Sequence, residues 1–155
     1  MIVEANREDF SSLCLGHAPR HFKNADTPIA PVDVLQMLSD VADEVWKSFS
    51  PASWLIIEDN ECVGVCSVKG PPQDGVIDIG YGIAPSRRRR GAAGRAVGEI
   101  VSWARSSPDV SAIIAETTPE HYASQRVLES NGFQRVGERI DDEDGPVICF
   151  KISTR

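Results

Sequence analysis

Residues 84–97 read APSRRRRGAAGRAV, four consecutive arginines followed by small residues. The preceding run, residues 75–85 (GVIDIGYGIAP), is largely apolar and is bounded by a glycine and a proline, which predicts a β-strand. Beyond the arginines, apolar side chains repeat at helical spacing at Val97, Ile100, Val101 and Ala104. The arginines therefore lie where a strand turns into a helix, which we expect to begin near Gly91.

The start of this helix is suited to binding an anion. The first N–H groups of a helix have no partner inside the helix, and the helix dipole places partial positive charge there. Small residues at Gly91, Ala92, Ala93 and Gly94 leave the backbone open to close approach. The sequence thus predicts a cradle for a diphosphate group.

Known phosphate motifs and the overall charge narrow this prediction. The lysine of a P-loop is absent, and Pro85 stands where a dinucleotide-binding fingerprint needs its third glycine. The pattern that fits is R-x-x-G-x-A, formed by Arg88, Gly91 and Ala93. The formal charge of the chain is −7. Proteins that hold nucleic acid through its phosphates are normally basic, so the charge favours a small anionic ligand and no nucleic-acid partner.

The composition indicates the class of protein. A length of 155 residues favours one domain. The sequence has no run of about 18 apolar residues, and its first residues lack the basic start and apolar block of a secretory signal. We therefore expect a cytoplasmic protein with no membrane partner.

The cysteines predict thiols and no metal site. No C-x-x-C pair occurs, and a cytoplasmic protein keeps its thiols reduced; Cys62 and Cys66 are expected to be buried on one face of a strand. Cys14, His17 and His21 are loosely spaced like metal ligands. However, Pro19 interrupts any helix that would align them, and no fourth ligand is evident.

The rest of the chain predicts alternating strands and helices. In the first half we expect a strand at 2–4, a helix at 7–15, a loop at 17–31, a helix capped by Asp33 with Gln36 and ended by Pro51, and a hairpin turning at 59–61. In the second half we expect the arginine helix, a buried strand at 111–117, a helix capped by Thr118 with Pro119 and stopped by Gly132, and two strands around an acidic turn at 141–146. The order β-α-α-β-β-β-α-β-α-β-β indicates a mixed α+β domain with at least one parallel, right-handed crossover.

Two segments carry a resemblance to a known family. Residues 77–101 (IDIGYGIAPSRRRRGAAGRAVGEIV) resemble the acetyl-CoA-binding signature of GCN5-related N-acetyltransferases, the GNAT superfamily, and residues 116–137 (ETTPEHYASQRVLESNGFQRVG) resemble its later strand-helix block. The resemblance is greatest to the branch that acetylates ribosomal-protein N-terminal alanines and small amines, and it spans residues 53–152. It implies the GNAT fold, a central mixed, mostly antiparallel twisted sheet of six to seven strands flanked by four helices.

The resemblance also implies a division of the chain and a co-substrate. Residues 1–155 would form a single N-acetyltransferase domain, with acceptor-side helices in 1–50 and an acetyl-CoA-binding core in 53–152. Acetyl-CoA would bind without a metal, its diphosphate on the amides of residues 89–94 and its pantetheine arm beside the end of the preceding strand. The implied cofactor-binding residues are Ile83, Ala84, Arg88, Arg89, Arg90, Gly91, Ala92, Ala93, Gly94, His121 and Ser124.

The implied reaction is direct attack of a primary amine on the thioester, and three residues are candidates for catalysis. Glu116 is the candidate base, which requires a water relay or a pKa raised by burial. His121 replaces the asparagine usual in the family, and it either replaces that hydrogen bond to pantetheine or acts as a base itself. Leu128 stands where many relatives have a tyrosine acid, so Ser124 is the expected donor to the sulfur, with Tyr81 and Tyr122 as further candidates.

The acceptor and two alternatives stay open at this point. The acceptor is an amine on a small molecule or a peptide, and the acidic turn at 141–144 either draws a cationic amine or is a solvated hairpin. Relatives often pair, so the resemblance allows a homodimer. The alternatives are a non-catalytic acyl-CoA-binding module and a nucleic-acid-binding domain, which the negative charge disfavours.

Overall fold

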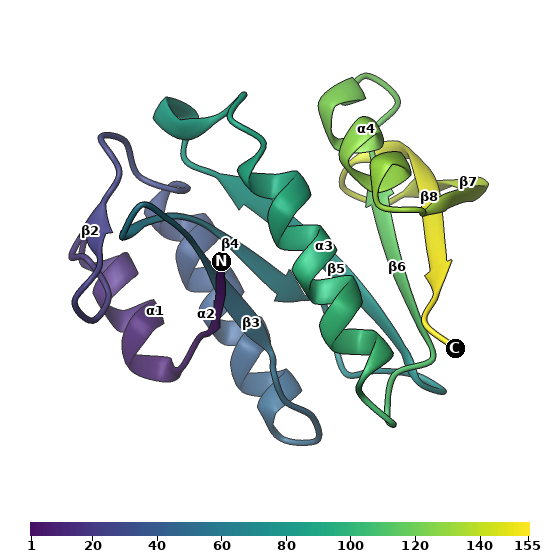
Figure 1. Cartoon of the computed structure of the whole chain (residues 1–155), viewed down its shortest axis with the longest axis horizontal. Helices are drawn as coiled ribbons and strands as arrows, with labels where there is room; N and C mark the ends of the chain where they lie inside the picture. The colour runs from purple at the N-terminus through teal and green to yellow at the C-terminus, as the bar shows by residue number, and fades with distance from the viewer.

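The computed structural model describes all 155 residues. They form one twisted sheet with helices on both of its faces (Figure 1). The strand order is β1-β3-β4-β5-β6-β8-β7, and the short β2 pairs with β4. Only β5–β6 and β2–β4 are parallel. The predicted α+β fold, with a mixed and mostly antiparallel sheet and four helices, is confirmed, although the sheet has eight strands rather than six to seven.

The elements follow the predicted order with one addition. The strands are β1 (Ile2–Glu4), β2 (Lys23–Asn24), β3 (Ser53–Glu58), β4 (Glu61–Val68), β5 (Val76–Ile83), β6 (Ala112–Thr117), β7 (Gln134–Asp141) and β8 (Gly145–Ser153). The helices are α1 (Arg7–Cys14), α2 (Val32–Trp46), α3 (Ala92–Arg105) and α4 (Tyr122–Ser130), with a 3-10 turn at Pro85–Arg87. The added strand is β2, which lies in the predicted loop and has only two residues, too few for a periodic pattern.

The predicted caps of two helices are wrong. Helix α2 begins directly after Pro31, whose extended backbone (ψ 153°) makes Val32 the first helical residue; Asp33 thus lies inside the first turn, and Gln36 bonds Asp40. Helix α4 begins four residues later than Thr118, because residues 118–121 form a separate turn. The side-chain amide of Gln125 holds this turn by donating to the carbonyls of residues 118 and 119 (3.2 and 3.0 Å).

The predicted stop of α4 at Gly132 is confirmed. Gly132 has a φ of 90°, and the N–H groups of Gly132 and Phe133 donate to the carbonyls of Glu129 and Leu128 (both 3.0 Å). These two bonds form a Schellman motif, with Phe133 and Leu128 both buried beneath it. The motif turns the chain from α4 into β7.

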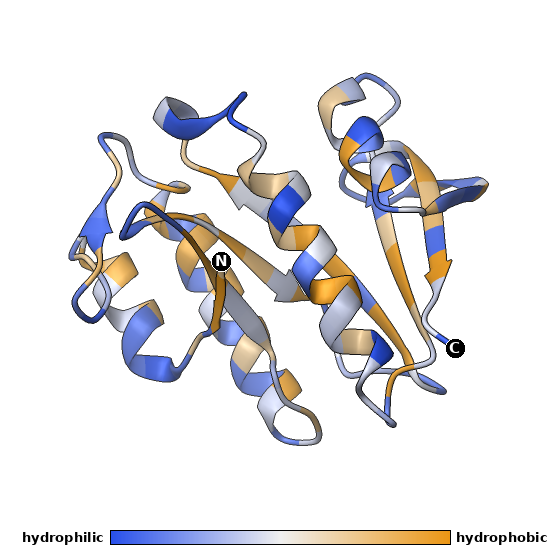
Figure 2. Ribbon diagram, viewed as in Figure 1, coloured by the Kyte–Doolittle hydropathy of each residue, from blue (hydrophilic) through white to orange (hydrophobic).

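The helices divide between the two faces of the sheet. Helix α3 covers the central strands and lies beside α4, whereas α2 packs on β4 from the opposite face and carries α1 (Figure 1). Under α3, the fully buried side chains of Val97, Ile100 and Ala104 meet apolar residues of β5 and β6, and Figure 2 shows the matching apolar stripes. Each large buried side chain contributes roughly 1.5–3 kcal/mol, so this contact fixes α3 against the sheet.

The first helix is tied down by an ion pair that the sequence pattern does not reveal. The Asp9 carboxylate is 2% exposed, and it accepts the backbone N–H of Asn6 (2.8 Å) and two guanidinium N–H bonds from Arg20 (3.1 and 2.8 Å). The carboxylate also raises the pKa of Arg20 through the hydrogen bond that it accepts. Arg20 thereby joins the loop after α1 to the start of α1.

Removing Arg20 should destabilise the protein because Asp9 would stay buried without its cation. We expect Arg20→Ala to lower the free energy of unfolding by roughly 2–4 kcal/mol. The matched control is Arg7→Ala, which breaks the exposed pair with Asp43 and should cost about 1 kcal/mol or less. Urea unfolding of both variants measures this, and equal losses would contradict the role given to Asp9.

Candidate functional site

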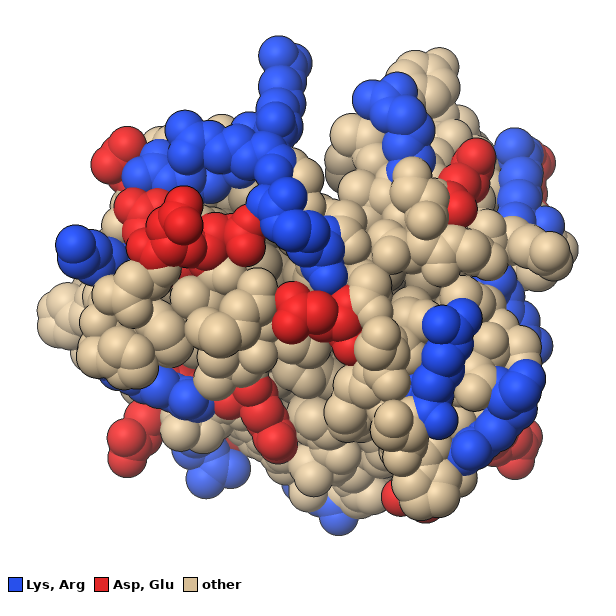
Figure 3. Space-filling model, viewed as in Figure 1, with Lys and Arg blue, Asp and Glu red and all other residues tan.

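A cleft opens where β5 parts from β6. Strand β5 pairs with β4 from Ile79 to Ile83, but it pairs with β6 only from Val76 to Ile79. Beyond that residue, a cleft of about 800 Å³ lies between β5, the arginine turn and the first turns of α3 and α4. Figure 3 shows this hollow between the arginines and the body of α4.

The last residues of β5 present free backbone groups to this cleft. Ala84 donates its N–H to Val63 of β4 (2.7 Å), and the Asp78 carbonyl accepts from Lys69 (2.7 Å), so these residues face β4. Successive residues face alternate edges, and Tyr81 and Ile83 therefore face the cleft. The Ile83 carbonyl accepts from the Arg88 side chain (3.1 Å), which leaves free the N–H of Ile83 and both backbone groups of Tyr81.

A hydrogen bond crosses the floor of the cleft. The hydroxyl oxygens of Tyr81 on β5 and Ser124 on α4 lie 2.7 Å apart, and Ser124 is 8% exposed. Burial raises the pKa of Tyr81 to about 12, so the phenol keeps its proton at neutral pH. The pair therefore holds two hydroxyl groups, both protonated, at the point where the strands separate.

The start of α3 has the uncapped form that the sequence predicts. Arg89 and Gly91 have positive φ angles (64° and 78°), which turn the chain sharply into the helix. The first helical hydrogen bond is donated by Arg95 to Gly91 (3.1 Å). The backbone N–H groups of residues 89–94 donate to no group of the protein. Six free donors thus lie at the positive end of a 14-residue helix.

The four arginines have different partners. Arg87 donates to Glu61 (2.7 and 3.0 Å) and Asp26 (3.1 Å), and these carboxylates raise its pKa further. Arg88 is joined to the end of β5 through Ile83. The side chains of Arg89 and Arg90 donate to no group of the protein and are exposed. The run therefore combines a structural anchor with free positive charge near the uncapped amides.

Most of the predicted cofactor-binding residues line the cleft. They are Ile83, Arg88, Arg89, Gly91, Ala92, Ala93, Gly94, His121 and Ser124. Arg90 and Ala84 do not, and Ala84 is fully buried with its N–H and carbonyl bonded to Val63 and Arg87. Ala84 thus has no free backbone group to offer a ligand. Tyr122 is 65% exposed and Leu128 is fully buried, so neither reaches the cleft.

Sequence reasoning missed several lining residues. On α4 these are Ala123, Arg126, Val127 and Ser130, which recur at helical spacing on one face of the helix. Continuing the helical spacing from Ala123 along α4 would have identified these residues. On β5 the missed residue is Gly82.

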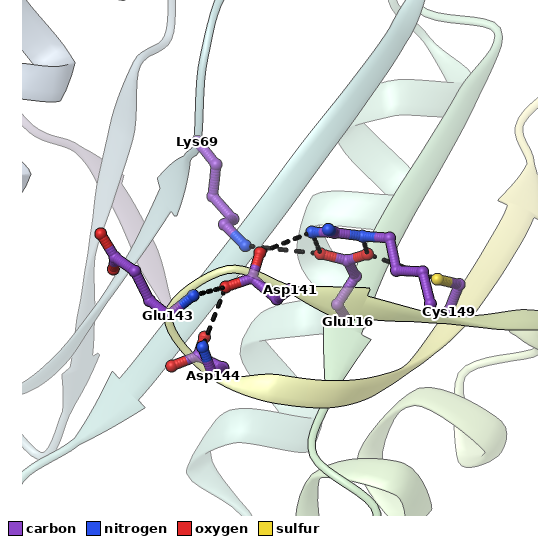
Figure 4. A network of polar contacts seen from close by, with 7 residues as sticks. Lys69, Glu116, Asp141, Glu143, Asp144 and Cys149 are labelled. Atoms are coloured by element: carbon purple, nitrogen blue, oxygen red, sulfur yellow. Dashed lines mark hydrogen bonds and ion pairs between the residues drawn. The ribbon is translucent and has the colours of Figure 1, made fainter.

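Glu116 lies on the other face of the sheet, in an ion-pair network (Figure 4). Its carboxylate accepts both guanidinium donors of Arg139 (2.7 Å for the Nη2–Oε1 pair) and the Cys149 thiol (3.3 Å), and Lys69 Nζ lies 4.0 Å away. Arg139 is the main cause that lowers the pKa of Glu116. Burial acts in the opposite direction but is outweighed, so the net pKa is lowered and a water relay is the only one of the two expected routes to a base that remains.

A second carboxylate, Asp78, stands near Glu116 and was not singled out from the sequence. Its Oδ1 atom is buried without a hydrogen-bond partner, and burial raises the pKa of Asp78. The acidic turn beyond the network is also tied internally. Asp141 accepts from the amides of Asp144 and Glu143 (3.0 and 3.1 Å) and from Arg139 (3.0 Å), which lower its pKa.

A second, smaller pocket lies between α2 and the sheet. Its volume is about 290 Å³, and it shares Tyr81 and Gly82 with the larger cleft. Nine of its 13 lining residues are apolar, and the acidic turn is not among them. The two hollows therefore meet at the end of β5, one from each face of the sheet.

The remaining predicted features concern thiols and metals. Cys62 and Cys66 are buried as predicted, and burial raises the pKa of Cys62 to about 12. The structure has no group of three or more histidine, cysteine or acidic side chains placed to hold a metal ion. None of its helices has the length and apolar character needed to cross a bilayer.

These features match a known family. The family model described as acetyltransferase (GNAT) domain matches residues 2–134. The chain therefore belongs to the GNAT family of acetyltransferases.

Relatives and solved structures agree with this assignment. The chain is 38% identical over 84 residues (52% of this chain, 50% of the relative) to the uncharacterized N-acetyltransferase YjdG of Bacillus subtilis (strain 168). It is 29% identical over 112 residues (72% and 62%) to the uncharacterized N-acetyltransferase p20 of Bacillus licheniformis. It thus spans about half to three-fifths of the length of these curated relatives.

The fold is shared with solved acetyltransferases. The aminoglycoside acetyltransferase AAC(6')-Ib, in complex with ribostamycin and coenzyme A, has a TM-score of 0.70 at 16% identity, covering 99% of this chain and 92% of that one. The ribosomal-protein-S5-alanine acetyltransferase from Vibrio fischeri has a TM-score of 0.73 at 17% identity, with coverages of 99% and 92%. At these identities the likeness shows the fold.

The network around Glu116 gives a pH-dependent prediction. The pKa of Glu116 is lowered on folding, so its stabilising charge is present above the unfolded value and is lost as the pH falls through the folded one. We expect the free energy of unfolding of Glu116→Gln to be about 1–2 kcal/mol lower than that of the wild type near pH 7. The gap between the two proteins should narrow as the pH falls through the folded pKa of Glu116. Urea unfolding near pH 7 and at progressively lower pH tests this, and a gap that does not change with pH would contradict it.

Proposed function

We propose that the protein transfers the acetyl group of acetyl-CoA to a primary amine. The observation that carries this proposal is the row of six free amides, residues 89–94, at the mouth of a cleft that continues along the unpaired edge of β5. Membership of the GNAT family supports it. The bound coenzyme A in AAC(6')-Ib, which has the same fold, supports it as well.

The free donors suit the parts of coenzyme A in order. Its diphosphate would lie on the amides of residues 89–94, with Arg89 and Arg90 adding charge. Its pantetheine amides would pair with the Tyr81 carbonyl and the Ile83 N–H, as an added strand pairs with a sheet edge. Ala84 was also expected to contact the arm, but it has no free backbone group, so we leave it out of the proposed contacts. This pairing with β5 also brings the thioester toward Tyr81 and Ser124.

The transfer needs a neutral amine. The amine nitrogen attacks the thioester carbonyl carbon, the C–N bond forms, and the C–S bond breaks with its electron pair going to sulfur. The Tyr81 backbone N–H faces the cleft and would stabilise the developing oxyanion. The Ser124 hydroxyl, held by Tyr81 at 2.7 Å, would donate to the departing sulfur.

The proton of the amine needs an acceptor as well. An alkylamine with a pKa near 10.4 is neutral to about one part in a thousand near pH 7, a deficit of about 4–5 kcal/mol. We propose Glu116 as the acceptor through a water relay, because Arg139 holds its carboxylate ionised. His121, at the start of α4 and lining the cleft, is the second candidate.

The proposal also covers the acceptor and the cellular compartment. The acceptor would be an amine on a small molecule or a peptide. This follows the aminoglycoside acceptor bound by AAC(6')-Ib in its complex with ribostamycin. All four cysteines are unpaired, which supports the reducing cytoplasm as the compartment.

Filling the cradle at Gly94 tests the proposal. A Cβ at Gly94 would meet no protein atom within 4 Å, although the residue lines the cleft. Leucine also favours a helix over glycine by about 0.5–1 kcal/mol, so Gly94→Leu should fold at least as stably as the wild type. We expect it to bind coenzyme A at least about tenfold more weakly, a loss of about 1.4 kcal/mol.

The control is Ser102→Leu, an exposed change on the same helix away from the cleft. Calorimetry with coenzyme A and thiol release from acetyl-CoA with a panel of amines give the two readouts. Unchanged affinity in Gly94→Leu would contradict the cradle. Binding without thiol release on any amine would favour the non-catalytic alternative.

A further inference from the structure

The smaller pocket, on the α2 face of the sheet, indicates what the acceptor looks like. Resting on the proposed function, we propose that the acceptor is a small primary amine carried on an aliphatic or aromatic group, and that this group fills the pocket. Polycationic amines would then be poor substrates. The pocket is lined by Ile29, Ala30, Val34, Met37, Leu38, Val41, Val65, Val68, Gly80, Gly82, Ser67, Lys69 and Tyr81.

The charge of the lining argues against a polycation. Lys69 is the only charged residue that lines the pocket, and no carboxylate does. An ammonium group placed there would lose its hydration without gaining a counter-ion from the lining. An apolar group gains from the same surroundings. The lining therefore suits a ligand whose only polar end is the reacting amine.

The nearby carboxylates are engaged elsewhere. Glu116 is bonded to Arg139, and Asp141 to Arg139 and to the amides of its own turn. Asp78 has one buried oxygen without a partner, but it does not line the pocket. Of the two interpretations that the sequence left open for the acidic turn, the solvated hairpin is the one favoured. A cationic acceptor would find no free carboxylate inside the pocket.

The size and position of the pocket fit a small ligand close to the thioester. Its volume of about 290 Å³ is at the lower limit of small-molecule sites, about 300–1,000 Å³. That room suits one ring or a branched aliphatic chain rather than an aminoglycoside of several rings. At the end toward the cofactor cleft, a Cβ at Gly82 would have no neighbour within 4 Å, so bare backbone leaves space for the amine.

The lining also contributes to catalysis on such a ligand. An apolar surrounding disfavours an ammonium, and so it lowers the pKa of a bound amine. A larger fraction of the bound amine is then neutral and able to attack the carbonyl carbon. The proton leaves before attack, to water or through the relay to Glu116. The pocket would thus select an apolar amine and prepare it.

Methyl NMR tests occupancy independently of turnover. The chain has two methionines, Met1 and Met37, and only Met37 lines the pocket. We expect 2-phenylethylamine or 3-methylbutylamine to shift the methyl resonance of Met37 in ¹³C-methionine protein bound to coenzyme A, and to leave that of Met1 in place. Spermidine should shift neither. A Met37 shift with spermidine alone would overturn the proposal.

A charge placed in the pocket tests the specificity by kinetics. Met37 is 51% exposed, so Met37→Glu should fold, and it should lower kcat/KM for 2-phenylethylamine by at least about tenfold while raising that for spermidine. Val32→Glu is the matched control, because Val32 is 61% exposed on the same helix and outside the pocket. We expect it to stay within about twofold of the wild type.

The outcomes separate the two proposals. A wild type that acetylates spermidine or kanamycin better than either apolar amine would overturn the specificity and leave the acetyltransferase activity standing. A wild type that binds acetyl-CoA and acetylates no amine would overturn the proposed function. If Met37→Glu and Val32→Glu change kcat/KM equally, the pocket is not the acceptor site.

Discussion

The separation of β5 from β6 after Ile79 is the constraint on which the rest of the site depends. It leaves the cleft-facing backbone of Tyr81 and Ile83 without a strand to pair with, and unpaired polar backbone is costly unless a partner or water satisfies it. The Tyr81–Ser124 hydrogen bond joins β5 to α4 across the cleft. The same separation lets the pocket under α2 meet the cofactor cleft through Gly82. The two halves of the site thus adjoin at one local feature of the sheet.

The arginine run is explained by the two tasks of the turn that it occupies. Arg87 is 12% exposed and is fixed by Glu61 and Asp26, so it anchors the turn to β4 and to the loop after β2. Ser86 strengthens this link through hydrogen bonds with Thr27 (2.9–3.2 Å). A turn held on two sides is ordered without a ligand, which reduces the entropy lost when the amides of residues 89–94 bind one. The other arginines supply charge in an otherwise acidic protein.

The sequence was sufficient for the parts of the site that local patterns determine. Helical spacing and small residues located the start of α3, and Gly132 marked the end of α4. The state of Glu116 was not accessible in this way, because Arg139 reaches it across β8 only through a sheet register that includes an irregularity between Arg135 and Gly137. The apolar lining of the pocket under α2 was not predicted either. Its residues, such as Met37 on the helix and Val65 on the sheet, come together only when the helix packs on the sheet. The cap assigned to Thr118 failed because Gln125 holds the preceding turn instead.

The most direct test of the central claim is a titration of ¹⁵N-labelled protein with coenzyme A, followed by amide resonances. If uncapped amides hold the diphosphate, the N–H resonances of residues 89–94 should move the most, and downfield, as each gains a hydrogen-bond acceptor. The resonances of Tyr81 and Ile83 should follow with the pantetheine arm. Binding that leaves the amides of residues 89–94 unchanged while shifts gather on another surface would contradict the account.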